Sequence, residues 1–409
     1  AGSVATIAST TAVPSFLDDS PQAKAQRELA AIEARRQPQV DTAWLQYSRS
    51  ATDGLSTLRG TEIPLLAMWP GGYDGHWFGQ LDAVHARAGT LPAQFAYSSQ
   101  FGKVQALAPA GLAEPVAEQA QGFSAEFGWR GEDRRFDLGV VGAGFKVPNV
   151  VGAWRESATW HDTDVSAELS RRVLTASLLS YAGAADPVTG AIWGGVTDTA
   201  LTLRAARDLA RDWNFSSSLS MGEVTGRNVL SNPNVQWRNV VDRDWIHRSD
   251  FRFSAGAVLS IWHYQYDQDF YSFGHGGYYS PQRYVSLGIP IEVQGRRGAL
   301  SYDLRAVPAW SWTYVQTAPY YPTDAGLQAL AGNPVYTSGT GTGGGPAGSI
   351  RADIEYRPAA HWSVGAWLNI DRSAYYAPNQ FMIYLRYWLE PQSGAPALPP
   401  RPVLPISLF

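Results

Sequence analysis

The chain has 409 residues, of which 45% are hydrophobic and only 17% are charged, and its formal net charge is −4. This near balance of charge excludes the broad basic face that a nucleic-acid partner requires, and the absence of cysteine excludes disulfides and thiol chemistry. The 51 aromatic residues, 16 Trp, 20 Tyr and 15 Phe, together with 40 Gly and 26 Pro, favour strands and turns over helices.

The first 38 residues differ from the rest of the chain. Residues 1–19 lack a basic region followed by an apolar run, so they predict a linker, and the chain is expected to be a piece of a longer protein. Residues 20–38 predict a helix that Ser20 caps and Pro38 ends. Its apolar stripe is thin, so it either packs on something outside this segment or is a solvated linker helix. No run of about 20 apolar residues predicts a transmembrane helix.

From Val40 onward the apolar residues recur with a period of two, which is typical of strands with one apolar and one polar face. In GFSAEFGWR, for example, Phe123 and Phe127 share one face while Ser124 and Glu126 share the other. The pattern predicts sixteen strands, at about 40–50, 61–69, 76–88, 121–130, 134–146, 150–160, 164–174, 195–208, 212–225, 235–246, 249–265, 281–294, 297–315, 347–357, 361–371 and 380–390.

The connections between these strands are of two kinds. Short turns such as PGGYDG, GED, HDT and one near Pro148 contrast with long loops, above all 89–120 and 316–346. Short turns at one end and long loops at the other indicate a transmembrane antiparallel β-barrel over residues 39–390, with both termini in the periplasm. A soluble sandwich or propeller is the alternative, but its strands are usually shorter, and no propeller repeat is visible.

A barrel of this size encloses an aqueous lumen, which the polar face must line. The interleaved carboxylates and guanidiniums either brace the wall as pairs or meet a substrate. The expected lumen charges are Glu126, Asp137, Glu168, Asp303, Asp353, Glu355, Glu390, Arg130, Arg172, Arg252, Arg305, Arg351 and Arg386. The aromatic residues expected on the same face, or else in an interfacial girdle, are Trp262, Tyr264, Trp367, Tyr384 and Trp388.

Catalytic and cofactor motifs are missing. The seven histidines show no metal-binding spacing, and neither a GxSxG elbow nor a phosphate-binding loop occurs. We therefore expect no cofactor, no metal and no enzymatic activity. A glycosidase would need a pair of carboxylates, and nothing in the sequence singles one out.

Three sequence blocks carry a resemblance to a known family. They are FGHGGYYSPQ (273–282), SRRVLTASLLSYAGAADPVTGAIWGGV (170–196) and GEVTGRNVLSNPNVQ (222–236). In order and spacing, they resemble the C-terminal, outer-membrane domain of the protein C family of bacterial cellulose synthase operons, over residues 40–390. Val173 departs from this pattern, because the family often has proline there.

The resemblance implies an outer-membrane channel that exports nascent cellulose, a β-1,4-glucan, from the periplasm. It also implies that the helix at 20–38 ends a periplasmic tetratricopeptide region. The expected partners are the glucan, outer-membrane lipid and periplasmic components of the synthase complex. A general diffusion porin and, less favoured, a barrel-embedded enzyme remain the alternatives.

The candidate site follows from this role, since aromatic rings stack on sugar faces and polar groups bond their hydroxyls. The candidate glucan contacts are Tyr278, Tyr279, His275, Trp262, Tyr264, Trp367, Tyr384, Trp388, Glu126, Glu168, Asp303, Asp353, Glu355, Arg252 and Arg305. The candidate gating residues are Gly274, Gly276, Gly277, Tyr181 and Trp193. The FGHGGYYSPQ segment is predicted at the extracellular end, where it forms either a gate or a loop that only stabilises the mouth.

The end of the chain, PQSGAPALPPRPVLPISLF (391–409), is too rich in proline for a strand of the closed sheet. A tethered, disordered tail on the periplasmic side is the favoured interpretation. Binding to a periplasmic partner or a return into the lumen through Ile406, Leu408 and Phe409 are the alternatives.

Overall fold

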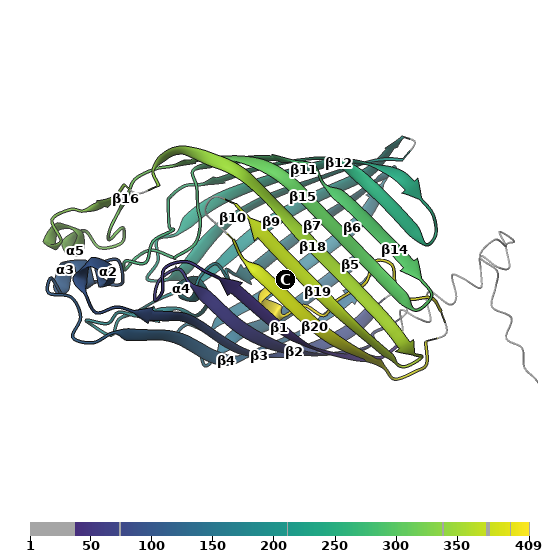
Figure 1. Cartoon of the computed structure of the whole chain (residues 1–409), viewed down its shortest axis with the longest axis horizontal. Coiled ribbons are helices and arrows are strands. Elements are labelled where there is room, and N and C mark those ends of the chain that lie inside the picture. The colour runs from purple at the N-terminus through teal and green to yellow at the C-terminus, as the bar shows by residue number, and fades with distance from the viewer. Residues whose placement is uncertain are drawn as a thin grey trace, which may run out of the picture.

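The computed structural model describes residues 37–72, 75–210, 212–337, 339–373, 377–392 and 394–408. The linker predicted at 1–19 and nearly all of the helix predicted at 20–38 lie outside these residues. The described chain forms a closed antiparallel barrel of sixteen strands, as the sequence predicts (Figure 1).

The barrel strands follow one another in chain order, and β1 closes the ring against β20, with Gln39 opposite Trp388. They are β1 (Gln39–Arg49), β2 (Leu58–Pro70), β3 (Gly75–Leu91), β4 (Val116–Gly131), β5 (Arg134–Ala143), β6 (Asn149–Trp160), β7 (Thr163–Val173), β9 (Ile192–Ala210), β10 (Trp213–Arg227), β11 (Asn232–His247), β12 (Phe251–Tyr264), β13 (Arg283–Gly288) with β14 (Ile291–Arg297), β15 (Leu300–Val315), β18 (Gly341–Ala359), β19 (Trp362–Arg372) and β20 (Asn379–Trp388). The short strands β13 and β14 both pair with β12 and β15 and together make one barrel strand. Pro290 lies at their break, because it has no N–H for the ladder.

The two faces of the barrel wall follow from the period of two. Outward positions hold exposed apolar side chains such as Leu65, Phe127 and Ile354, while the intervening positions point into the lumen. Near the short turns the outer face carries an aromatic girdle, in which Trp77 stacks on Phe127 with ring centroids 5.3 Å apart.

The two ends of the barrel differ as expected, with one exception. The short connections after β2, β4, β6, β9, β11, β14 and β18 lie at one end, together with the start of β1 and the end of β20. We call this the short-turn end and the opposite one the long-loop end. The turn near Pro148 joins β5 to β6 and therefore lies at the long-loop end. Its length misled the prediction, because a loop's length alone does not fix the end to which it belongs.

The long loops build a cap with its own small elements. These are α2 (Phe95–Ser98), α3 (Val104–Leu107), α4 (Leu178–Ala182), β8 (Ala184–Ala185), β16 (Ala318–Pro319), α5 (Ala325–Leu330) and β17 (Val335–Tyr336). Figure 1 shows α2, α3 and α5 grouped beyond the strands at this end. Apolar side chains from different loops pack here into one core that includes Phe101, Trp193, Phe273, Tyr278 and Tyr321. Among the described residues, no helix has the length and apolar character to span a membrane.

The C-terminal tail returns into the barrel, and the chain end lies within the barrel outline in Figure 1. The single-turn helix η1 (Ile406–Leu408) ends the described chain, with Ile406 only 1% exposed. The preference for a disordered tail was therefore wrong, and the alternative of a return into the lumen is correct for Ile406 and Leu408, while Phe409 lies outside the described residues. Proline prevents this segment from joining the sheet, but its carbonyls and apolar side chains remain free to pack against the lumen wall.

Candidate functional site

The charged residues expected in the lumen do occupy lumen-facing positions, apart from one. On β18, for instance, the buried Asp353 and Glu355 alternate with the exposed Ile354. Glu390 lies beyond the last residue of β20 and is exposed, so its placement in the lumen was wrong. The alternating pattern ends at Trp388, and the chain turns there toward the tail.

Most lumen charges brace the wall as ion pairs. Arg172 pairs with Asp137 at 2.6 Å, and Arg204 with Glu168 at 3.1 Å. The same holds for two further pairs, Arg252 with Asp244 at 2.7 Å and Arg351 with Asp353 at 2.8 Å. These residues neutralise one another in pairs, as the bracing interpretation of the sequence predicts.

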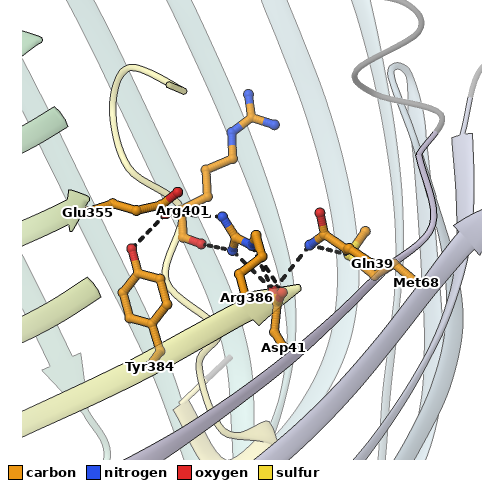
Figure 2. A network of polar contacts seen from close by, with 7 residues as sticks. All are labelled: Gln39, Asp41, Met68, Glu355, Tyr384, Arg386 and Arg401. Atoms are coloured by element: carbon orange, nitrogen blue, oxygen red, sulfur yellow. Dashed lines mark hydrogen bonds and ion pairs between the residues drawn. The ribbon is translucent and has the colours of Figure 1, made fainter. Parts of the chain in front are cut away.

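The most buried charge network joins β1, β18 and β20 (Figure 2). The Arg386 guanidinium donates to both carboxylate oxygens of Asp41, at 3.0 and 3.1 Å from its Nε, and to Glu355 Oε2 at 3.1 Å. Tyr384 donates to the same Glu355 oxygen at 2.8 Å. Arg386 also donates to the main-chain carbonyl of Arg401, so the network holds the tail as well as the wall.

The tail is fixed to the wall at its far end. Gln80 Nε2 donates to the Leu404 carbonyl at 2.8 Å, and the main-chain N–H of Ile406 donates to Asp82 Oδ2 at 2.6 Å. Ser407 donates its hydroxyl proton to Glu62 Oε2 at 2.8 Å. Wall carboxylates thus take up the donors of a segment that forms no sheet ladder.

Three of the aromatic residues that were candidates for glucan contact are buried, and the tail packs on two of them. Trp367 and Tyr384 pack in one cluster with Val403 of the tail, and they are 5% and 1% exposed. Trp388 is likewise buried. All three face the lumen as predicted, but no open surface remains on them while the tail is in place.

The FGHGGYYSPQ segment lies in the loop between β12 and β13 and is almost wholly buried. His275 Nε2 donates to the Pro319 carbonyl at 2.9 Å, and burial lowers the pKa of His275 to about 4. Tyr278 Oη accepts from Asn232 Nδ2 at 3.0 Å. Gly274 and Gly277 have φ of 105° and 67°, a region that favours glycine. Gly276 lacks a positive φ, but a Cβ there would meet the Tyr278 ring at 2.4 Å.

The other candidate gating residues sit beneath this loop. Trp193 is fully buried, edge-on to Phe101 with centroids 5.1 Å apart. Tyr181 of α4 donates to Glu62 Oε1 at 3.0 Å. Glu62 therefore accepts from both a long loop, through Tyr181, and the tail, through Ser407. Sequence reasoning missed Glu62, since only the folded barrel brings residues 62, 181 and 407 together.

The part of the wall away from the tail carries a continuous row of hydroxyl and guanidinium groups, of which Ser260 and Ser311 are buried. Each member lies directly opposite the next on the neighbouring strand, in the order Ser157, Ser166, Arg204, Ser218, Arg238, Ser260, Ser286 and Ser311. We call these eight residues the serine–arginine track. Ser157 lies near the short turn after β6 and Ser311 near the long loop after β15, so the track runs along the barrel from end to end.

A cavity of about 540 Å³ opens along the part of this track nearer the short-turn end. Ser157, Ser166, Arg204, Ser218 and Arg238 are among the residues that line it. The strand spacing of about 4.8 Å sets the separation of successive groups. The track was missed from the sequence because single-strand patterns show the face of a residue but not its register with the next strand.

An aromatic pair lies beside the part of the track nearer the long-loop end. Trp262 stacks on Tyr284 with centroids 4.4 Å apart and an interplanar angle of 20°. Both rings are half-buried, and Tyr284 is opposite Thr313. Thr313 in turn hydrogen-bonds the hydroxyl of Tyr279 at 2.9 Å, which connects the wall to the capping loop. Tyr264 lies nearby, with its hydroxyl accepting from Gln236 at 3.2 Å, whereas Tyr284 was missed.

The other candidate glucan contacts on the barrel wall also lie at lumen-facing positions. Glu126 and Asp303 face the lumen, and Glu126 is only 4% exposed. Arg305 lies opposite Arg351 across β15 and β18. Among the described residues, no three His, Asp or Glu side chains converge in a way that could hold a metal ion.

Comparisons with known proteins agree on one family. The family described as "Cellulose synthase operon protein C C-terminus" matches residues 56–390. Cellulose synthase operon protein C of Escherichia coli (strain K12) is 33% identical over 297 residues, which cover 71% of this chain and 25% of that protein. The protein of the same description from Pseudomonas fluorescens (strain SBW25) is 31% identical over 393 residues, 94% of this chain and 30% of the relative.

The chain thus spans only 25–31% of the length of these first relatives. Among solved structures, a "Bacterial polysaccharide outer membrane secretin" superimposes with a TM-score of 0.53. Its sequence identity is 8%, and the match covers 87% of this chain and 99% of that structure. This likeness shows a shared barrel fold.

Proposed function

This chain belongs to the family of cellulose synthase operon protein C C-termini, and on that premise we propose that it is the outer-membrane channel through which a nascent β-1,4-glucan leaves the cell. The short-turn end faces the periplasm, and the long-loop end faces the exterior. The region before β1 continues into a periplasmic tetratricopeptide domain that meets the synthase complex. Outer-membrane barrels usually have short turns in the periplasm and long loops outside the cell, which supports this orientation.

The observation that carries this proposal is the serine–arginine track. A glucan edge displays hydroxyls that both donate and accept hydrogen bonds, and serine hydroxyls and guanidiniums are suited to them. Neighbouring strands are about 4.8 Å apart, which is close to the length of one pyranose unit. The chain can therefore exchange contacts with one hydroxyl or guanidinium group for contacts with the next as it advances, so that many weak sites replace a single tight one.

The aromatic pair Trp262 and Tyr284 supplies a different contact near the exit. The flat C–H face of a pyranose stacks on such rings. Tyr279, whose ring centroid lies 6.4 Å from that of Tyr284, extends this aromatic group toward the cap, whereas Tyr278 packs on Tyr264 and is buried. The candidate contacts Trp367, Tyr384 and Trp388 would join the path only after the tail moves.

Two elements obstruct the path and act as the gate in this proposal. One is the loop 265–282 with its glycines and the underlying Tyr181 and Trp193, and the other is the tail 391–409. Glu62 bonds both elements, so displacement of the tail removes the hydrogen bond from Ser407 and changes the surroundings of the carboxylate that holds Tyr181 of α4. Carboxylates such as Glu126, Asp303, Asp353 and Glu355, with Arg252 and Arg305, then line the widened lumen.

The test is single-channel conductance in a planar bilayer, using the chain with and without residues 391–409. Cellohexaose added on the short-turn side is expected to interrupt ion flow, whereas maltohexaose is not, because an α-linked chain coils and presents its hydroxyls in a different geometry from an extended β-1,4-glucan. Equal indifference to both sugars in an open channel would favour a general diffusion porin. The family and fold indicate transport, so hydrolysis of cellohexaose during the recording would overturn the assignment and favour an enzyme.

A further inference from the structure

The outer surface of β1–β4 changes from apolar to polar along one row near the long-loop end. Ile63, Ala83 and Phe123 lie opposite one another and form the last apolar row. The next outward row consists of Gln46, Thr61, His85 and Gln121, each opposite its neighbour. Because polar groups are costly in hydrocarbon, this change marks the upper boundary of the membrane on these four strands.

Two arginines lie one row beyond this boundary. Arg59 of β2 and Arg87 of β3 are direct register partners, flanked by Ser48 and Gln119. Such partners have Cβ atoms about 5 Å apart, and like charges in this position destabilise a sheet. Both side chains are exposed on the outer face. The pair therefore costs free energy that the barrel alone does not recover.

Neither arginine has a carboxylate partner among the described residues. Asp53, in the loop after β1, lies beside Gly89 and forms an ion pair with neither. Two outward arginines at the short-turn end have carboxylate partners, since Arg134 pairs with Glu156 at 2.9 Å and Arg207 lies 3.7 Å from Asp162. A third, Arg243, lies 4.7 Å over the Trp245 ring. The arginine pair of β2 and β3 is thus left to a ligand from outside the chain.

A hollow lies directly below the pair on the same face. It has a volume of about 510 Å³, and Thr61, Ile63, Ala83, His85 and Gln121 line it. Its lower part is apolar and its upper part offers hydrogen-bonding groups. This order suits an amphiphile whose acyl chain lies on Ile63 and Ala83 and whose anionic head reaches the arginines.

We infer that Arg59 and Arg87 bind a phosphate group of a phosphorylated glycolipid in the outer leaflet, with His85, Gln119 and Gln121 bonding its sugar hydroxyls. Two guanidiniums side by side match phosphate oxygens in geometry and charge. A glycolipid is favoured over a phospholipid because the row of amide and imidazole groups below the arginines suits sugar hydroxyls. The inference rests on the proposed function in one respect, that the long-loop end faces the exterior.

The experiment measures lipid binding to the purified, folded barrel by native mass spectrometry. The probes are a bisphosphorylated diglucosamine lipid, the same lipid without phosphates, and phosphatidylglycerol. The wild-type chain is compared with Arg59→Gln/Arg87→Gln and with the control Arg283→Gln. Arg283 faces outward on β13 at the same end, 5.7 Å over the Tyr314 ring.

We expect the double variant to lose at least tenfold in affinity for the bisphosphorylated lipid, whereas the control keeps it. The wild type should bind the phosphate-free lipid and phosphatidylglycerol at least tenfold more weakly. Equal binding by the wild type and the double variant would overturn the site, and equal binding of phosphatidylglycerol would overturn the glycolipid assignment. Block of conductance by cellohexaose, measured on the same double variant, should be unchanged, so loss of that block would instead count against the proposed channel.

Discussion

Replacement of Ile406 by aspartate should release the end of the tail from the lumen wall. Ile406 is 1% exposed and packs with residues including Leu58 and Val84. Loss of this burial costs about 2–3 kcal/mol, and a new carboxylate beside Asp82 adds at least ~2 kcal/mol for desolvation and repulsion. Roughly 4 kcal/mol or more corresponds to a shift of about 10³-fold toward the released tail.

The chain has no cysteine, so Leu408→Cys supplies a single reporter at the tail end. In the Ile406→Asp background, a hydrophilic maleimide should label this cysteine much faster, and single-channel conductance should rise. The matched control is Ala397→Asp, which adds the same charge at an exposed tail position and should change neither reading. Slow labelling of the Ile406→Asp variant, equal to that of the control, would refute the assignment of Ile406 as the anchor.

Other changes follow from the same structure. Arg386→Met leaves the carboxylates of the Asp41 network buried without a cation and should cost about 3–5 kcal/mol in thermal unfolding, whereas Arg134→Met, whose pair with Glu156 has side chains 67% and 45% exposed, should cost at most about 1 kcal/mol; equal losses would contradict this account of the network. Trp262→Ala should weaken block by cellohexaose about fivefold, because stacking contributes roughly 1 kcal/mol, and unchanged block would remove Trp262 from the path. Burial raises the pKa of Asp267 to about 7 and lowers that of His275 to about 4. As the pH falls below about 7, protonation of Asp267 therefore favours the closed cap, whereas protonation of His275 in the open state favours opening only below about 6.5. Conductance should therefore fall between pH 8 and pH 6.5, and Asp267→Asn should abolish that change; a wild-type response retained in the variant would contradict the role of Asp267.

The barrel was predictable because the pattern that defines it, alternation of apolar and polar side chains, is contained within each strand. Each strand must alternate apolar and polar side chains to meet lipid and water, and this alternation marks all sixteen strands and the lumen side of residues such as Glu126 and Asp353. Strand ends were also close, as with the predicted 150–160 and the observed Asn149–Trp160. The turn near Pro148 was assigned to the wrong end of the barrel, because loop length is a weaker signal than side-chain periodicity.

The contents of the lumen were not predictable in the same way. The tail has no periodicity, and its seat depends on carboxylates of β2 and β3 that lie more than 320 residues away in the chain, such as Asp82. The strand sequences around Trp367 and Tyr384 therefore could not show whether these side chains are exposed to the lumen or covered by the tail. The serine–arginine track depends on the register between strands, which no single segment contains.

The most direct test of the central claim is whether blocking the track stops export. In cells that produce the full-length protein, Ser218→Cys places a thiol on the lumen face between Arg204 and Arg238, while Ser217→Cys places one on the opposite face, where Trp237 bonds Ser217. After complete labelling with a bulky maleimide, secreted β-1,4-glucan should fall to near background for Ser218→Cys and stay at the wild-type level for Ser217→Cys. Undiminished secretion from fully labelled Ser218→Cys would contradict the account, because the glucan would then not pass along this track.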